Sequence, residues 1–572
     1  MRYLQFAISI LAGLIVEATA SPTPPVLHNP TVTVRNGTLA GVRNTAFDQD
    51  FFLGIPYATP PIHEHRLKRP KPPQAWNGTR IANAYGPSCA GNPFSLPGFT
   101  QSFDGSTSED CLQLNIVRPA TLLSNHTKLP VLVWFHGGGW VTGSAVDPRY
   151  NGSFLVQNSV RMGTPIIFVS ANFRLGTFGF LAGSVIEKAG LTNNGLRDQR
   201  QALHWIQENI VSFGGDRDRV TLFGESAGAG MIAQQLIAFG GRDDNIFHQA
   251  IMESGTAATA APYLDSQERE KRFQQLANAT GCASSLDVLT CLQAVSTESL
   301  SLANPTRPPL LTVNDDFFPE LPSKLLDEGR FLHVPIIVGT NRNEGTTILS
   351  SLLTTLKTPI NNFKDFTAYY SDRGYPLPAL KKLWDIYGDE ISNPTEAGLG
   401  VVSPTQKSPE LGSEFARASL WAGDSGFTFS RRLMNQVWNA AGVASYSYFF
   451  DIVPAESFLD PSTYGVAHFS EIPYVFGNAE AVGWEKNPIP QGPDKADYLK
   501  IVELMSRMWI SFTVSGSPNN HKSEYTPLFI FIHSSSVFFI QISILPMYVV
   551  ELLFCFRQRT FTNQCHSSRG RL

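Results

Sequence analysis

The sequence predicts an α/β fold in which a central, mostly parallel sheet is flanked by helices. Short apolar runs of strand length recur along the body of the chain, and helical patterns lie between them. Strands that alternate with helices in this order typically form a parallel sheet that is covered on both faces. The 572 residues include 42% hydrophobic and 16% charged residues, enough to bury a large core, which excludes general disorder.

The predicted strands are four apolar runs, at residues 129–135, 165–171, 219–223 and 334–338. Residues 195–210 place apolar side chains at the spacing of an amphipathic helix, and residues 231–238 form another helical run. Parallel sheets bind ligands beyond the carboxyl ends of their strands. The residues that follow these strands are therefore the candidates for function.

The charge balance makes a nucleic acid an unexpected partner. Lysine and arginine number 44 against 48 acidic residues, for a net charge of −4, and no long basic run occurs. No cysteine belongs to a C-x-x-C pair, which argues against a zinc or redox site. We predict no metal and no cofactor.

Residues 1–20 predict a removable signal peptide. Arg2 precedes the mostly apolar residues 4–16, and Ala18-Thr19-Ala20 supplies the small-x-small pattern before a cut at Ser21. The alternative is a short membrane anchor, but the run is too short to span comfortably and no basic stop-transfer cluster follows it. Secretion also suits the five N-x-S/T sequons, which lie at Asn36, Asn77, Asn125, Asn151 and Asn278. We therefore expect an extracellular, glycosylated protein.

Four cysteines lie in two locally close pairs. In an oxidising compartment the natural local pairings are Cys89 with Cys111 and Cys282 with Cys291. The residues alone leave this connectivity open.

A candidate nucleophile follows the third predicted strand. Gly224-Glu225-Ser226-Ala227-Gly228 is a G-x-S-x-G pattern between a strand and a helical run. Small residues on both sides of a serine allow the sharp turn that exposes its hydroxyl. The alternative is a glycine-rich turn with a helix-capping serine, but the strand–turn–helix context favours the nucleophile.

A glycine run follows the first predicted strand. His136-Gly137-Gly138-Gly139-Trp140 exposes backbone N–H groups that could stabilise the oxyanion of a tetrahedral intermediate. The alternative is a glycine hinge. Two such motifs at two strand ends favour acyl-transfer chemistry.

In triads built on this elbow, the acid and then the histidine follow the serine in the chain. The histidines far enough downstream are His468, His521, His533 and His566. Among them His468 is favoured as the base, because the others lie in a polar linker or an atypical tail. Glu344, just after the fourth strand, is the first candidate for the acid, and Asp315 and Asp316 are its rivals.

The chain resembles the type-B carboxylesterase/lipase family, which includes the cholinesterases. Besides the motifs above, the resemblance is carried by FLGIPY from residue 52, EDCLQLN from 109, NFRLGTFGF from 172, NGLRDQ from 194 and FGGD from 213. It runs from about residue 30 to about 520, and within the family it points to the secreted fungal esterases and lipases.

The resemblance implies one α/β-hydrolase domain over residues 21–522. It implies a serine carboxylic ester hydrolase that cleaves carboxylic esters, including lipid esters, through an acyl-enzyme. Ser226 would be the nucleophile, His468 the base and Glu344 the acid. The implied oxyanion donors are the backbone N–H groups of Gly138, Gly139 and Ala227, and the implied disulfides are Cys89–Cys111 and Cys282–Cys291.

Two alternatives follow from known relatives. Some members of this family are non-catalytic adhesion proteins that have lost the serine, whereas this chain keeps every catalytic position. Cholinesterases carry a tryptophan in the first disulfide loop, and its absence here disfavours a choline ester. In the lipases this loop forms the lid. Its four large apolar residues, Phe94, Leu96, Phe99 and Phe103, predict an esterase with modest lipase activity.

Residues 523–572 differ in character from the rest of the chain. Residues 537–556 are apolar with one charge, Glu551, and arginines follow them. A gene-model error is the first interpretation of this tail, and a membrane tail anchor is the alternative. From its length alone, a chain of this size would be expected to hold roughly four domains. The patterns above instead predict a signal peptide, one hydrolase domain and an atypical tail.

Overall fold

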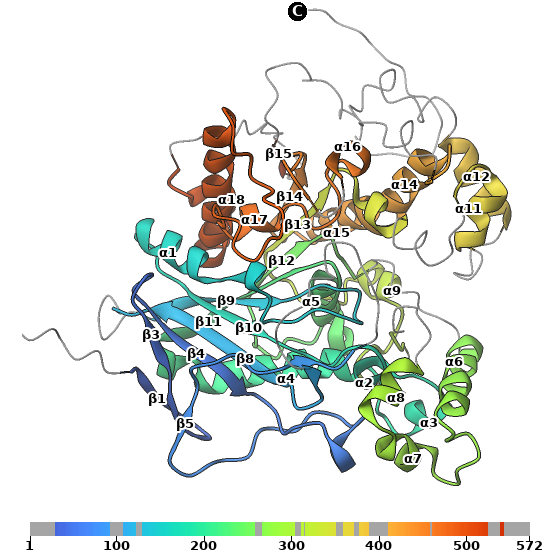
Figure 1. The fold of residues 1–572 in the computed structure, drawn as a ribbon, viewed down its shortest axis with the longest axis horizontal. Coiled ribbons are helices and arrows are strands. Elements are labelled where there is room, and N and C mark those ends of the chain that lie inside the picture. Colours follow the sequence, from blue (N-terminus) through green and yellow to red (C-terminus); the bar gives the residue numbers. More distant parts are fainter. Residues whose placement is uncertain are drawn as a thin grey trace, which may run out of the picture.

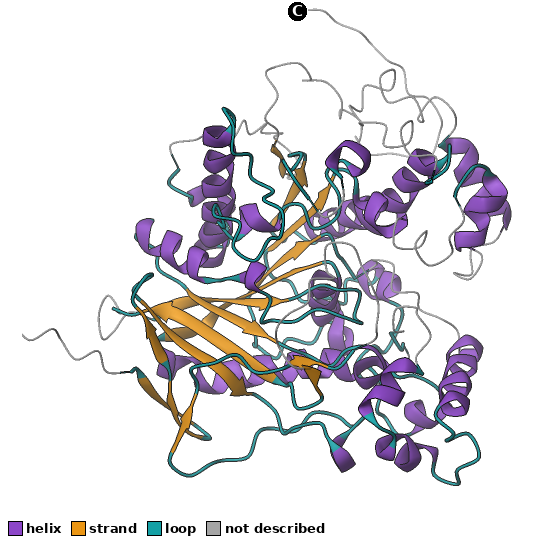
Figure 2. Ribbon diagram, in the orientation of Figure 1, coloured by secondary structure: helices purple, strands orange, loops and turns teal. Residues whose placement is uncertain are grey.

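A ten-stranded sheet forms the centre of the molecule (Figures 1 and 2). The computed structural model describes residues 29–91, 107–121, 128–257, 266–303, 311–313, 315–349, 359–370, 377–387, 410–457, 460–523 and 538–542. In spatial order the strands are β15 (Phe538–Ile542), β14 (Ser445–Phe450), β13 (Ile336–Asn341), β12 (Gln249–Glu253), β11 (Gly215–Glu225), β9 (Leu129–Phe135), β10 (Ile167–Ala171), β8 (Gln113–Pro119), β4 (Gln49–Pro56) and β3 (Val42–Asn44).

Most neighbouring strands of this sheet are parallel. Every pair from β10 through β9, β11, β12, β13 and β14 to β15 is parallel, and only β8, β4 and β3 add antiparallel pairs at one side. The predicted fold class is therefore confirmed. The four predicted strands correspond to β9, β10, β11 and β13, and the predicted helices to α4 (Asn194–Asn209) and α5 (Ala227–Ile237).

Strand β9 shows why the central strands are apolar without interruption. Val131 and Val133 pack on one side with residues of α4 and α5. Leu132 and Trp134 pack on the other side with residues of α1 (Ser153–Arg161), α17 (Ile472–Val475) and α18 (Lys495–Ser515). Since helices cover both faces of the sheet, the side chains on both sides of this strand are apolar and do not alternate with polar ones.

Further helices complete the cover of the first face. Helices α9 (Pro322–Asp327) and α15 (Phe429–Ala440) contribute buried residues to the same core as α4 and α5. Short strands form two small sheets beside the main one, from β1 (Thr31–Val34), β2 (Gly37–Ala40) and β5 (Thr79–Ile81), and from β6 (Ser88–Cys89) and β7 (Thr107–Ser108).

Two helical groups have small cores of their own. One lies beyond the carboxyl ends of the strands and contains α11 (Phe363–Tyr370), α12 (Leu377–Ile386) and α14 (Phe415–Gly423). The other contains α2 (Gly176–Phe180), α3 (Ser184–Lys188), α6 (Ser266–Ala279), α7 (Val288–Ala294) and α8 (Thr297–Leu302). Helix α16 (Pro461–Tyr464) precedes the loop of His468.

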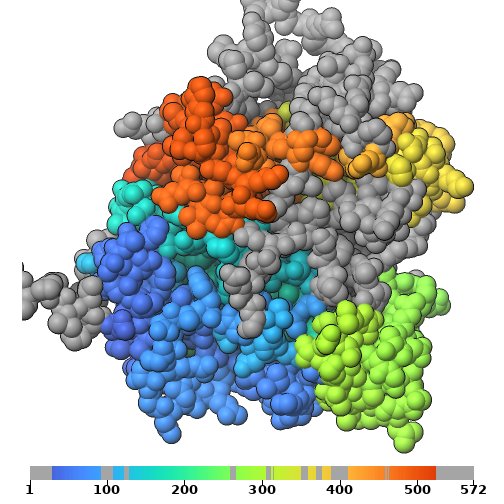
Figure 3. Space-filling view, viewed as in Figure 1, coloured from blue at the N-terminus to red at the C-terminus, as the bar shows by residue number. Residues whose placement is uncertain are grey.

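Segments far apart in the sequence meet on one face of the molecule. In the space-filling view, residues of α18, in orange-red, lie against the cyan residues of α1 (Figure 3). The atoms of Asn158 in α1 and Ser506 in α18 are in hydrogen-bond contact, Nδ2 to Oγ, at 3.1 Å. Helix α18 thus packs with α1 against the central strands β9 and β11.

The segment that the sequence sets apart, residues 523–572, contributes strand β15. It pairs in parallel with β14 from Tyr446 opposite Phe538 to Phe450 opposite Ile542. The rest of the apolar run 537–556 lies outside the described residues, as does the predicted signal peptide. Among the described helices, none combines the length and apolar character needed to cross a bilayer.

Candidate active site

Ser226 lies on a sharp turn between β11 and α5. Its backbone has φ 55° and ψ −122°, a strained conformation outside the helical and strand regions. A Cβ at Gly224 or Gly228 would lie 2.8 or 2.1 Å from the carbonyl oxygen of Phe135 in β9. The glycines of the motif are therefore required by the close approach of the turn to its neighbouring strand. The backbone N–H of Ser226 donates to the carbonyl of Glu253 at 2.8 Å.

The structure brings Ser226, His468 and Glu344 into one hydrogen-bonded chain. The Nε2 atom of His468 lies 2.8 Å from the Ser226 hydroxyl, and its Nδ1 atom lies 2.5 Å from a Glu344 carboxylate oxygen. Ser226 follows β11, Glu344 lies just after β13, and His468 lies in the loop after α16. The two contacts join residues 242 and 124 positions apart in the sequence, so only the fold brings the three side chains together.

Glu344 is further fixed by donors to its other oxygen. The Ser254 hydroxyl donates to that oxygen at 2.5 Å, and the backbone N–H of Asn341 donates at 2.7 Å. The rivals Asp315 and Asp316 lie elsewhere, in ion pairs with Arg197. The structure therefore places Glu344, and neither rival, against the imidazole of His468.

Three more carboxyl groups are buried around this chain, and the sequence motifs did not single them out. Glu225 lies 3.2 Å from Nε2 of His468. Burial, followed by the charge of Glu471, raises the pKa of Glu225 and of Glu253 well above the ordinary value. Burial and then the charge of Glu344 raise the pKa of Glu471 to about 7. Crowded buried carboxyl groups of this kind favour their neutral forms.

A weak signal for these residues existed in the sequence. Glu225 and Glu253 end two adjacent parallel strands, and Glu471 follows His468 by three residues. The side chains are stabilised by specific donors: Trp509 Nε1 donates to Glu253 at 2.8 Å, and Asn341 Nδ2 donates to Glu471 at 2.5 Å. No local sequence pattern predicts these long-range hydrogen-bond donors.

The glycine run adopts a tight loop directly after β9. Gly138 and Gly139 have φ of 103° and 63°, values that suit glycine. A Cβ on Gly138 would lie 2.3 Å from the carbonyl oxygen of Thr142. Ala227 is the first residue of α5, so its N–H is free of an intrahelical acceptor.

His136 contacts this loop and the residue Phe173. Its ring stacks on Phe173 with centroids 4.5 Å apart and planes 14° from parallel. Its Nδ1 lies 2.8 Å from the carbonyl oxygen of Gly137, which makes it the donor in that bond. Burial lowers the pKa of His136 to about 4, so the imidazole is uncharged at neutral pH.

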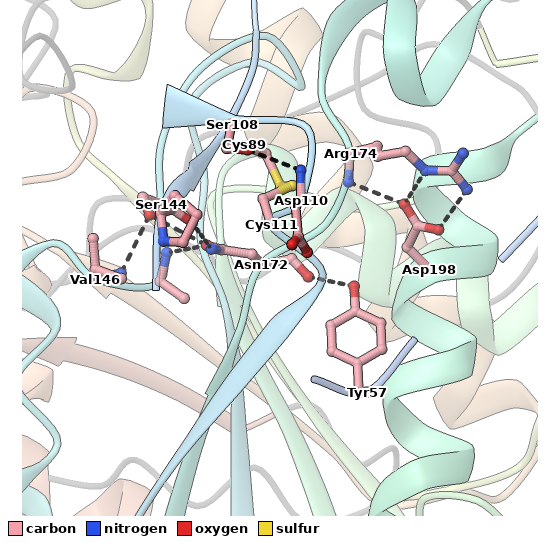
Figure 4. The surroundings of a disulfide bond; sticks show 12 residues. Tyr57, Cys89, Ser108, Asp110, Cys111, Ser144, Val146, Asn172, Arg174 and Asp198 are labelled. Carbon is pink, nitrogen blue, oxygen red and sulfur yellow. Dashed lines mark hydrogen bonds and ion pairs between the residues drawn. A yellow bond between two sulfur atoms is a disulfide. The ribbon is translucent and has the colours of Figure 1, made fainter. Parts of the chain in front are cut away.

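Within the described part of the chain, Cys89 is bonded to Cys111 and Cys282 to Cys291, the two pairings that the resemblance implied. Figure 4 shows the first one beside Asn172, the residue that follows β10. Asn172 accepts a hydrogen bond from Tyr57 at its carbonyl (2.6 Å) and from Ser144 at its side chain (3.2 Å). This disulfide therefore closes its loop close to the carboxyl end of the sheet.

The predicted glycosylation sites differ in exposure. Asn77 and Asn278 are exposed, whereas Asn36 and Asn151 are half-buried and Asn125 lies outside the described residues. The Asn36 side chain donates to the carbonyl of Pro73 at 2.8 Å. The four apolar residues predicted to lie in a lid loop, Phe94, Leu96, Phe99 and Phe103, are also outside the described residues.

The family model described as "Carboxylesterase family" matches residues 28–547. The chain belongs to the carboxylesterase family. It is accordingly an enzyme, a carboxylic ester hydrolase, and the match extends past β15 into the C-terminal segment.

Proteins similar to this carboxylesterase are named as lipases and as an esterase. It is 33% identical to Lipase 2 of Geotrichum candidum, over 74% of this chain and 78% of that protein. Secreted lipase 1 of Botryotinia fuckeliana is 32% identical, over 86% of each chain. Fumonisin B1 esterase of Sphingopyxis macrogoltabida is 30% identical, over 91% of this chain and 89% of that protein.

A solved structure shares the fold. The crystal structure of Aspergillus niger EstA superposes with a TM-score of 0.72 at 27% identity, covering 87% of this chain and 90% of that chain. The α/β-hydrolase fold that the resemblance implied is thus shared with this solved structure.

Proposed function

We propose that the protein is a secreted serine esterase that cleaves carboxylic esters through an acyl-enzyme intermediate. The observation that carries the proposal is the chain from Ser226 Oγ to His468 Nε2 at 2.8 Å and from His468 Nδ1 to Glu344 at 2.5 Å. A serine hydroxyl becomes a nucleophile only when a neighbouring base can take its proton.

In the proposed reaction the Ser226 oxygen attacks the ester carbonyl carbon while His468 takes the hydroxyl proton. Glu344 holds the imidazole in the tautomer that accepts at Nε2 and stabilises the imidazolium. The backbone N–H groups of Gly138, Gly139 and Ala227 stabilise the oxyanion. The C–O bond to the alcohol then breaks, and His468 protonates the leaving alcohol.

The second half of the reaction releases the acid. His468 takes a proton from water, the resulting hydroxide attacks the acyl-enzyme, and the proton returns to the Ser226 oxygen as the acyl bond breaks. Glu225 lies 3.2 Å from Nε2 of His468. Burial raises the pKa of Glu225, which favours its neutral form and disfavours a second negative charge beside the base.

The substrate class we propose is an ester with a short to medium acyl chain, with modest activity on lipid esters. The support is the predicted short apolar lid loop and the lipase and esterase names of the relatives. Comparing hydrolysis of short-chain and long-chain nitrophenyl esters tests this. A strong preference for long, micellar substrates would contradict it.

The decisive experiment is covalent labelling. The purified protein should react with a nitrophenyl phosphonate, and peptide mapping should find the label on Ser226. Ser226→Ala should lose labelling and ester turnover, whereas Ser284→Ala, a change at an exposed serine, should keep both. Full turnover in Ser226→Ala would refute the assignment, and an unlabelled, inactive wild type would favour the binding or adhesion alternative.

A further inference from the structure

The loop that carries the base contains a backbone conformation that needs external support. Phe469, directly after His468, has φ of 79°, a region that bulky residues rarely occupy. Its side chain is buried. Such a conformation persists only where the surroundings determine it. Because one peptide bond joins the two residues, whatever holds Phe469 also sets the direction of the His468 imidazole.

The group that covers the Phe469 ring is the guanidinium of Arg149. Its Cζ atom lies 4.8 Å from the ring centroid of Phe469 and 5.6 Å from that of Trp484. The centroids of these two rings are 5.6 Å apart. The ring of Tyr150 meets Phe469 edge-on, at 6.0 Å and 81°. Arg149 is therefore the cation of a buried aromatic cluster built around the residue after the base.

Arg149 is itself held rigidly. Its Nε and Nη2 atoms donate to Oδ2 of Asp147 at 2.9 and 2.5 Å, and its backbone N–H donates to Oδ1 at 2.9 Å. Both side chains are 1% exposed. A Cβ on Gly483 would lie 2.7 Å from the backbone nitrogen of Arg149, so the turn before Trp484 packs directly on the backbone of this segment. The planar guanidinium is thus a fixed surface, which an ammonium group could not reproduce.

The opposite side of the His468 loop is anchored by the segment after β13. Asn341 Nδ2 donates to the carbonyl of Ala467 at 3.1 Å, and Asn343 exchanges two hydrogen bonds with the backbone of Val466, at 2.9 and 3.0 Å. These contacts hold the residues before the base. The Arg149 cluster holds the residue after it.

We propose that Arg149 is a positioning residue for the esterase reaction: by holding Phe469 in its left-handed conformation, it aims His468 at Ser226. The inference rests on the proposed function, because it concerns the base of that reaction. Arg149 does not touch the reacting atoms. It acts through Phe469, and this route predicts a pattern of kinetic effects that a merely structural ion pair would not produce.

The test compares Arg149→Lys with a matched control, Arg118→Lys. Arg118 also pairs with a buried aspartate, Asp50, at 3.1 Å and lies 5.3 Å over an aromatic ring, Phe52, but on the β4–β8 side of the sheet. Turnover of a short-chain nitrophenyl ester and the rate of phosphonate labelling are measured on folded protein, with folding checked by thermal unfolding. For Arg149→Lys we expect kcat and the labelling rate to fall about 10- to 100-fold while KM stays within about twofold.

A second variant, Phe469→Leu, tests the route through Phe469 while leaving the buried Arg149–Asp147 ion pair unchanged. It should lower kcat and leave KM unchanged. Combining it with Arg149→Lys should give little further loss of kcat, since both changes remove the same support. The proposal is overturned if Arg149→Lys keeps kcat within about twofold of the wild type, if Arg118→Lys loses as much, or if the losses of the double variant multiply. An inactive wild type would instead refute the proposed function.

Discussion

Replacing Glu471 by glutamine should change how the stability of the protein depends on pH. Glu471 is fully buried, and one of its oxygens accepts from Asn341 Nδ2 at 2.5 Å. Burial and the neighbouring Glu344 raise its pKa to about 7 from an ordinary 4.5. Glutamine has nearly the same shape and keeps an oxygen for Asn341, but it cannot ionise.

The magnitude follows from the proton balance. Between pH 4.5 and about 7 the unfolded chain releases the Glu471 proton while the native chain keeps it. The free energy of unfolding of the wild type therefore falls as pH rises through this window, by about 1.4 kcal/mol per pH unit and about 3 kcal/mol in total from this group. The variant lacks this loss. Its stability relative to the wild type should rise by about 3 kcal/mol between pH 4 and pH 8.

Urea unfolding followed by tryptophan fluorescence at several pH values between 4 and 8 measures this difference. Glu485→Gln is the control, because Glu485 is an exposed side chain close by in the sequence. The control should run parallel to the wild type at every pH. If the free energies of Glu471→Gln and of the wild type also run parallel, so that their difference changes by less than about 1 kcal/mol, the reasoning is wrong.

Three further outcomes are expected. Glu344→Gln should lower kcat on the order of 1,000-fold in a nitrophenyl ester assay, because the amide cannot stabilise the imidazolium as the carboxylate does; a loss below about tenfold would exclude Glu344 as the acid. Gly138→Ala should lower kcat at least about 100-fold, since the added Cβ would lie 2.3 Å from the carbonyl oxygen of Thr142 and displace the donor loop; unchanged kcat would show that this loop does not hold the oxyanion. Glycans released by an N-glycosidase should map by mass spectrometry to the exposed Asn77 and Asn278, and bare asparagines at both would refute the exposure argument.

Much of the fold was readable from local sequence patterns. The run 129–135 was predicted as a strand and is β9 with the same bounds, and residues 195–210 were predicted as a helix and form α4 one residue earlier. A strand buried on both faces and an amphipathic helix each leave a pattern within a dozen residues. The order of these elements along the chain then predicted the parallel sheet.

The site was only partly readable. Ser226 and Gly138 belong to motifs whose geometry is local, and Glu344 was recognisable as the first acid after a predicted strand. The choice between Glu344 and Asp315 depended on which carboxylate reaches the imidazole, and the structure places Asp315 in an ion pair with Arg197. Such a contact spans more than a hundred residues and leaves no periodic pattern in the chain.

The sequence by itself determined the α/β class, the strand ends and the motifs that follow them, because hydrophobic periodicity and glycine turns are local properties. Only the tertiary structure decided the surroundings of His468: the buried carboxyls of Glu225, Glu253 and Glu471, and the packing of Arg149 on Phe469. Their pKa values and orientations depend on burial and on partners from distant segments. Those quantities exist only when the chain has folded.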